Sequence, residues 1–128
     1  MSDQGEIKIT IELFGIGSLK GVIMRHLGPI SADATLDKMP FVLRGRFCFG
    51  SKNYWTLPIG IRKGLDSKAT RKVEKGDIVY SPKTDEIIIV LEDIEMPNKI
   101  NKIGKVTQNI ELFQKASNGL NTKIIKST

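Results

Sequence analysis

The sequence predicts a mainly β fold, an antiparallel barrel or sandwich of about eight short strands with two short helices. Apolar and polar residues alternate in short segments, and glycine, proline, asparagine and serine separate these segments. No long helical segments connect the strands, which excludes a parallel α/β fold because such a fold needs crossover helices. The 128 residues suit a single domain spanning 1–128.

The first forty residues predict a hairpin followed by a short helix. Segment 6–14 alternates strictly, with one face formed by Ile7, Ile9, Ile11 and Leu13. A glycine-containing turn joins it to a returning strand at 19–27. Ser31 or Asp33 is expected to cap a helix that runs to about Met39, where the following proline ends it.

The middle of the chain predicts two further strands and a basic connection. Segment 41–50 alternates, with Phe41, Leu43, Phe47 and Phe49 in phase. Gly45 occupies the remaining in-phase position, which predicts a bulge or a close approach of backbone. A strand follows at 54–61, and Pro58 within it predicts a sheet edge or a bend. Residues 62–75 are expected to form a polar, basic connection.

The C-terminal third predicts the remaining strands and the second helix. The strands are expected at 78–82, at 86–93 and near 100–107. A turn at 96–98 precedes the last of them, and a short helix follows at 109–117. Residues 121–128 are expected to be a loosely docked tail.

The net charge of +6 is concentrated in blocks. Residues 41–75 hold nine basic side chains against two acidic ones, whereas residues 76–98 hold one basic against six acidic. Residues 1–40 carry a net charge of −1 and residues 99–128 a net charge of +5. The excess therefore predicts a local positive patch at 41–75, unless the blocks pair with one another.

The composition predicts a cytoplasmic protein. The sequence has no basic start followed by an apolar stretch, so we expect no secretory signal. Apolar runs of four or five residues exclude a membrane-spanning helix. The one cysteine excludes an internal disulfide framework and suits a reducing compartment.

Most site chemistries lack the residues that they need. His26 is the single imidazole, and its position within a predicted strand favours a half-exposed histidine over a catalytic base. Cys48 is expected to be a packing residue or an exposed thiol, not a nucleophile. The glycines at 15–21 join two strands and do not open a helix, so they predict a turn and not a phosphate loop. No catalytic residue and no cofactor is predicted.

No metal site is predicted either. Zinc would need about four cysteine, histidine or carboxylate ligands, which the chain does not supply at the usual spacing. Glu92, Asp93 and Glu95 could attract a divalent cation, but a solvated strand end that faces the basic blocks is the preferred interpretation.

The basic segment 41–75 suggests nucleic acid as one alternative partner. It is interleaved with aromatic residues, the combination that single-strand binders use for phosphate contact and base stacking. These residues are Phe47, Phe49, Tyr54 and Trp55. Aromatic residues that alternate in strands are more often core residues, so this alternative is not the favoured one.

Several segments together resemble the cyclophilins. GVIMRHLGPISADATLDKM at 21–39 resembles the opening strand, turn and helix of that family. KGDIVYSP at 75–82 with EIIIVLED at 86–93 resembles its central strands, and residues 101–119 resemble its ending. The stretch VEKGDIVYSP and the short length are similar to a prokaryotic cyclophilin-like family of unknown function. The resemblance implies a closed antiparallel β-barrel.

The isomerase site of the cyclophilins matches this chain poorly. The resemblance implies an arginine in the strand after the first helix, where Arg44 or Arg46 is the stand-in, although neither is in register. The glutamine-glycine-glycine-aspartate stretch that follows in isomerases is absent, and the loop between the central strands is cut to 83–86. Ile100 stands where isomerases have a histidine before the final strand. A weak prolyl cis-trans isomerase is therefore an alternative and not the main expectation.

We expect a binding module for a peptide or a small anionic ligand, with its site on the face built by 41–50 and 53–61. Arg44 and Arg46 would donate charge-assisted hydrogen bonds, and Tyr54 and Trp55 would supply a stacking or apolar surface. In the alternative arrangement, both arginines pair with the acidic residues at 92–95 and the aromatic rings lie in the core. The strand interrupted by the proline at 58 would leave an edge through which a homo-oligomer could form.

Overall fold

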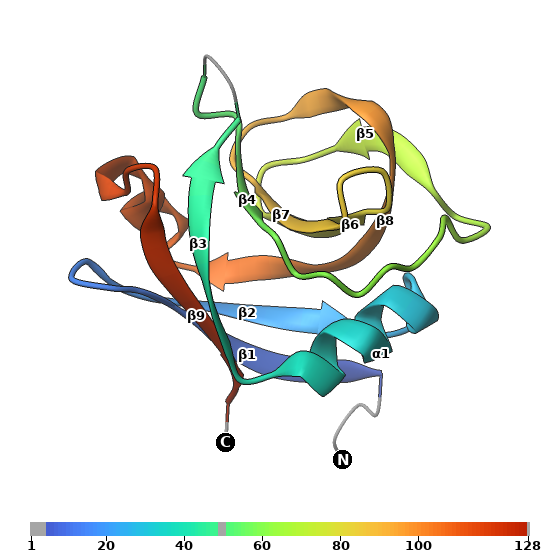
Figure 1. Ribbon diagram of the computed structural model, residues 1–128, viewed down its shortest axis with the longest axis horizontal. Coiled ribbons are helices and arrows are strands. Elements are labelled where there is room, and N and C mark those ends of the chain that lie inside the picture. The colour runs from blue at the N-terminus through green and yellow to red at the C-terminus, as the bar shows by residue number, and fades with distance from the viewer. Residues whose placement is uncertain (1–4, 49–50, 128) are drawn as a thin grey trace.

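The computed structural model describes residues 5–48 and 51–127 (Figure 1). They form one nine-stranded antiparallel sheet with an α-helix and a 3₁₀ helix. The elements in chain order are β1 Glu6–Leu13, β2 Gly17–Met24, α1 Pro29–Lys38, β3 Phe41–Phe47, β4 Tyr54–Leu57, β5 Thr70–Val73, β6 Asp77–Ser81, β7 Glu86–Val90, β8 Ile94–Gln108, η1 Ile110–Lys115 and β9 Leu120–Lys126.

Eight of these strands close into a barrel. Their order is β2-β1-β9-β3-β4-β7-β6-β8, and the pairing of β8 with β2 joins the two ends. The ninth strand, β5, pairs with the first half of β8 alone. The predicted fold class, a closed antiparallel barrel of about eight strands with two short helices, is confirmed.

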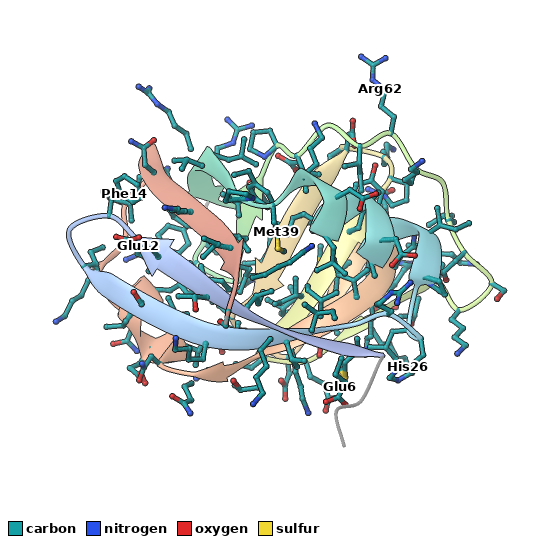
Figure 2. The ribbon with its side chains drawn as sticks, turned by 90° about the horizontal axis from the view of Figure 1, so that it is seen from below. Glu6, Glu12, Phe14, His26, Met39 and Arg62 are labelled. Carbon is teal, nitrogen blue, oxygen red and sulfur yellow. The ribbon has the colours of Figure 1, made fainter. Side chains whose placement is uncertain are left out.

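Two apolar clusters lie on opposite faces of the barrel wall. The larger cluster fills the barrel and includes the predicted inward face of β1, namely Ile9, Ile11 and Leu13. Met39, at the end of α1, lies over this interior (Figure 2). The smaller cluster lies outside the barrel, where β5 and the first half of β8 cover outward-facing residues of β6 and β7. Its members are Val73, Val79, Ile88, Val90, Met96 and Ile100. Burial on both faces explains why β7 is almost entirely apolar.

The first helix begins earlier than the predicted caps. Gly28 is the N-cap and Pro29 begins α1, so Ser31 lies inside the helix and is buried. Asp33 instead accepts a hydrogen bond from Arg25 Nε at 2.6 Å. The second helix is confirmed in position, but it is a shorter 3₁₀ helix.

One long strand replaces the turn predicted at 96–98 and the strand predicted near 100–107. β8 runs through Pro97 because the pairing with β5 is irregular there: Lys72 lies opposite Glu95 and Thr70 opposite Ile100. The extra residues form a bulge, and a bulge accommodates a proline that has no N–H to donate.

The C-terminal segment is a central strand, which corrects the expectation of a loose tail at 121–128. β9 pairs with β1 on one side and with β3 on the other. Its alternate residues Thr122 and Ile124 are buried within the barrel. A short alternating segment at the end of a chain can thus be needed to complete a sheet.

Three smaller expectations also change. β4 ends at Leu57 and pairs on both sides, so Pro58 follows the strand and leaves no free edge there. The connection predicted at 62–75 contains the short strand β5. His26 lies exposed in the turn after β2 and not within a strand (Figure 2).

No helix in the described ranges is long and apolar enough to cross a membrane.

The charge blocks pair sparsely: residues 5–48 and 51–127 contain two ion pairs, Arg25 with Asp33 and Lys102 with Asp77. The expected pairing of Arg44 and Arg46 with the acidic residues at 92–95 is absent from this part of the chain.

Candidate ligand-binding site

A pocket of about 560 Å³ opens on the outer face of the barrel, between the β3–β4–β7 part of the wall and the first half of β8. Its lining mixes charged, hydroxyl, amide and apolar side chains. They are Arg46, Phe47, Cys48, Tyr54, Thr56, Ser81, Thr84, Glu86, Ile88, Met96, Pro97, Asn98, Ile100 and Asn118. Pockets of about 300–1,000 Å³ with a few polar groups on an apolar lining are typical of small-ligand sites.

The pairing register of three strands builds the floor of the pocket. Arg46 lies opposite Thr56, and Thr56 lies opposite Ile88, so these residues form one row across β3, β4 and β7. Residues two positions along a strand share its face, which adds Tyr54 on β4 and Glu86 on β7 to the same outer surface. Local alternation therefore determines which side chains face the pocket.

The second apolar cluster forms the inner wall of the pocket. Ile88, Met96 and Ile100 each expose 3% of their surface or less, and all three line the pocket. β8 brings Met96 and Ile100 over β7, while the bulge opposite β5 places Pro97 and Asn98 at the same opening. An apolar part of a ligand would lose its contact with water against this wall.

Two opposite charges share the pocket without pairing. Arg46 is exposed and Glu86 is half-buried, and neither takes part in an ion pair within the described residues. Both also line an adjoining hollow of about 510 Å³ that includes Arg44, Thr56 and Asn118. The pocket and this hollow therefore form one continuous surface, with Arg46 and Glu86 common to both.

Tyr54 adds a hydroxyl group that stays protonated at neutral pH. Its pKa is raised, first because the ring is partly buried and then because electrostatic repulsion from the side chains of Cys48 and Glu86 disfavours the phenolate. The neutral hydroxyl can both donate and accept a hydrogen bond.

The structure places two of the four predicted site residues at the pocket and a third beside it. Arg46 and Tyr54 line the pocket, and Arg44 lines the adjoining hollow. Trp55 is fully buried inside the barrel, which corrects its predicted role as a ligand surface. Adjacent residues of a strand point to opposite faces, so Tyr54 and Trp55 cannot both line one pocket.

Trp55 is instead a central core residue. Its Nε1 donates a hydrogen bond to Thr122 Oγ1 at 3.2 Å, and its ring contacts Phe47 edge-on with the ring centroids 4.8 Å apart. The indole lies against Gly45, where an added Cβ would come within 2.1 Å of Nε1. The predicted close approach of backbone at Gly45 is thus confirmed, and the indole ring explains it. Phe49, which was predicted in phase with Phe47, lies outside the described residues.

The sequence analysis missed Glu86 and the apolar wall. The signal was present at 86–90, where the strand is apolar on both faces apart from its first residue. Such a strand predicts that something covers its outer face. The covering segment, 94–100, includes Pro97, and a turn was predicted at 96–98 in place of a continuous strand.

The other candidate residues do not form a site. Cys48 Sγ lies 3.0 Å from Ser51 Oγ, and no contact joins the thiol to His26 in the described ranges. Asp93 accepts a hydrogen bond from the Lys75 amide. Within residues 5–48 and 51–127, no group of three histidine, cysteine or acidic side chains could hold a metal ion.

Two solved structures resemble this chain in fold. No protein-family model and no curated protein matches the sequence. The solution structure of the hypothetical protein AF2241 from Archaeoglobus fulgidus is similar with a TM-score of 0.79 and 15% identity, over 99% of this chain and 100% of that chain. The structure of McbB in complex with tryptophan is similar with a TM-score of 0.78 and 12% identity, over 93% of this chain. This chain spans 44% of the McbB chain, and at these identities the likeness shows a shared closed-barrel fold.

Proposed function

We propose that this chain is a binding module, and that its outer-face pocket takes a peptide or a small anionic ligand. The observation that carries the proposal is Arg46, which has no ion-pair partner within residues 5–48 and 51–127 and lines a pocket with a buried apolar wall. A guanidinium group binds a carboxylate through two parallel hydrogen bonds. The wall formed by Ile88, Met96 and Ile100 accommodates an apolar group attached to that carboxylate.

The cyclophilin-like assignment belongs to this proposal. The closed eight-stranded barrel, with an opening hairpin that leads into α1, supports it. McbB, which shares this fold over 44% of its own chain, was solved in complex with tryptophan, a small molecule that carries a carboxylate, and this supports the proposed ligand class. We place the protein in the cytoplasm, since its single cysteine is a free thiol.

The two alternative functions have less support than the binding module. Prolyl isomerisation needs a donor to the proline nitrogen and an apolar slot that prefers the twisted amide. For the donor alone this chain has stand-ins, Arg46 in the pocket and Arg44 in the adjoining hollow. Single-strand nucleic-acid binding needs exposed aromatic rings, but Trp55 is buried in the core. The basic residues of 41–75 also lie on separate elements: β3, the β3–β4 connection, the β4–β5 loop, β5 and the β5–β6 turn.

An NMR titration tests the binding proposal. The probes are N-acetyl-phenylalanine, which has a carboxylate and an apolar group, and an alanine-proline peptide. We expect shift changes centred on Tyr54, Thr56 and Ile88. Arg46→Gln should weaken the binding of N-acetyl-phenylalanine roughly tenfold or more, since a hydrogen bond to a charged group contributes about 1.5–3 kcal/mol.

Lys8→Gln is the matched control, because it removes the same charge from an exposed position on β1. It should leave the affinity unchanged. If neither these two probes nor free phenylalanine perturbs the pocket residues at millimolar concentration, the proposal is wrong. Two further assays address the alternatives: peptide isomerisation at the uncatalysed rate removes the isomerase, and no binding to single strands at low salt removes the nucleic-acid binder.

A further inference from the structure

We infer that the ligand of this pocket is a free α-amino acid with an apolar side chain. The inference rests on the proposed function and names the ligand class for the same site. A simple anion would account for Arg46 but not for Glu86. A ligand that carries both an ammonium group and a carboxylate accounts for both residues.

Glu86 is the residue that favours a ligand with an ammonium group over a simple anion. It is half-buried, lines both the pocket and the adjoining hollow, and has no ion-pair partner within the described residues. Its cross-strand neighbour is Ser81, whose hydroxyl accepts a hydrogen bond from Thr84. Since hydroxyl groups are neutral, Ser81 and Thr84 do not compensate the carboxylate charge, and Arg44 and Arg46, which line the adjoining hollow, form no ion pair with it within the described residues.

An anion bound at Arg46 would meet this carboxylate in the same pocket. Like charges that share a partly buried site repel each other, and partial burial makes an unpaired carboxylate costly. A ligand ammonium group next to Glu86 removes both penalties. The site then contains two complementary charge pairs, one at Arg46 and one at Glu86.

The sheet geometry leaves room for such a ligand between the two charges. Arg46 and Ile88 lie two strands apart, which is about 10 Å, and Glu86 is two residues from Ile88, which adds about 7 Å along β7. The two Cα atoms are therefore about 12 Å apart, and the two side chains do not form an ion pair within the described residues. The adjacent ammonium and carboxylate of an α-amino acid can span the gap between the side-chain ends.

The rest of the pocket suits the apolar side chain of an amino acid. The buried surfaces of Ile88, Met96 and Ile100 offer an apolar wall to the ligand side chain. The protonated hydroxyl of Tyr54 can donate to the ligand carboxylate. Arg46 and Glu86 would therefore bind the charged groups of the ligand, while the apolar wall at β8 would contact its side chain.

Three probes separate the contributions of the ligand charges. Phenylalanine has both charges, N-acetyl-phenylalanine has the carboxylate alone, and phenylalanine amide has the ammonium alone. On the unmodified protein, we expect phenylalanine to bind at least tenfold more tightly than either derivative, measured by NMR titration. Because this comparison uses one protein, it does not depend on any variant folding correctly.

Glu86→Gln then tests the assigned residue. It should weaken phenylalanine binding at least tenfold and leave N-acetyl-phenylalanine binding unchanged or stronger. Glu12→Gln is the matched control, because Glu12 is an exposed acid on β1 that points away from the barrel (Figure 2). It should change neither affinity.

The possible outcomes distinguish this inference from the proposed function. If N-acetyl-phenylalanine binds as tightly as phenylalanine, or if Glu86→Gln leaves phenylalanine binding unchanged, the amino-acid assignment is overturned while the anion site stands. If no probe perturbs the pocket, both proposals fail.

Discussion

Gly45 shows how a single missing side chain shapes the barrel core. The indole ring of Trp55 lies directly against the backbone of β3, in the space that any other side chain would fill. The same ring contacts Phe47 and Phe113 and donates a hydrogen bond to Thr122 on β9. One glycine therefore lets a large aromatic residue connect β3, β4, η1 and β9.

We predict that Gly45→Ala destabilises the protein by about 2 kcal/mol, because overpacking a well-filled core costs roughly 1–3 kcal/mol. The new Cβ would lie 2.1 Å from Trp55 Nε1, so the ring or the strand must move. Urea unfolding followed by the fluorescence of the single tryptophan measures this loss.

Gly64→Ala is the matched control. An added Cβ at Gly64 meets no atom within 4 Å, so its effect should stay within about 0.5 kcal/mol. Equal stability of Gly45→Ala and the unmodified protein would contradict the assigned role of the glycine.

The long connection between β4 and β5 is held by side-chain hydrogen bonds and not by regular secondary structure. Asp85 Oδ1 accepts hydrogen bonds from the amides of Ile61 and Arg62 at 3.0 and 2.9 Å, and from the Tyr80 hydroxyl at 2.6 Å. Lys63 in turn donates its amide to the Tyr80 hydroxyl. Because these partners lie in and beside the β6–β7 turn, they fix the start of the connection.

A second polar group holds the other end of the connection. Asn101 on β8 donates to Ser31 Oγ and to the Gly64 carbonyl, each at 2.9 Å, and accepts from the Asp66 amide. Figure 1 shows the resulting path of the loop past α1 on its way to β5. Each end of the connection is therefore fixed to a different part of the barrel.

Asp85→Asn should destabilise the protein by about 1 kcal/mol at neutral pH, since hydrogen bonds to a charged acceptor are roughly twice as strong as those to a neutral one. Asparagine keeps the acceptor oxygen and tolerates the positive φ of 56° at this position. Burial acts to raise the pKa of Asp85, but the hydrogen bonds from Tyr80 and from the amides of Arg62 and Ile61 lower it overall.

This lowered pKa determines the pH dependence. A carboxyl whose folded-state pKa lies below its unfolded value adds stability above the unfolded pKa, about 3.9, and loses it as the pH falls through the folded pKa. The stability difference between the unmodified protein and Asp85→Asn should thus be constant above about pH 5 and shrink below about pH 4. Asp37→Asn, on the exposed face of α1, is the control. A difference that stays the same from neutral pH down to acid would rule out the charge as its source.

Closure of the whole barrel depends on the close approach of β2 and β8. Ile23 lies opposite Gly104, and a Cβ at Gly104 would come within 2.1 Å of the Val22 carbonyl oxygen. A Cβ added at Gly21 would likewise lie 2.9 Å from the Lys105 carbonyl oxygen. Since these neighbours are backbone atoms, they cannot give way as a flexible side chain can.

Gly104→Ala should therefore cost about 3 kcal/mol, the upper end of the usual overpacking range, because β2 and β8 must separate. Urea unfolding gives the free energy, and hydrogen exchange should show faster exchange at the amides of both strands than elsewhere. Lys105→Ala changes an exposed neighbour on the same strand and should cost less than about 1 kcal/mol. Unchanged protection of β2 and β8 in Gly104→Ala would contradict this account of closure.

Local alternation along the chain accounts for much of what could be predicted. It placed β1 correctly and pointed to close packing at Gly45. Alternation also predicts that Tyr54 and Trp55 face opposite sides of the sheet. The predicted site included both residues, so it conflicted with this alternation. These properties depend on neighbouring residues along one strand, so a sequence carries them directly.

Which strands pair, and what covers them, depends on the folded chain. Arg46 and Glu86 are forty residues apart and share a pocket because β4 pairs with both β3 and β7. The pocket has an apolar wall because the bulged first half of β8 lies over β7. β9 is a central strand because it forms hydrogen bonds with β1 on one side and with β3 on the other. Local periodicity in the sequence thus determined which residues lie on each face of a strand. The tertiary structure decided which strands pair, through hydrogen bonding and burial between distant segments, because no short-range pattern specifies a long-range partner.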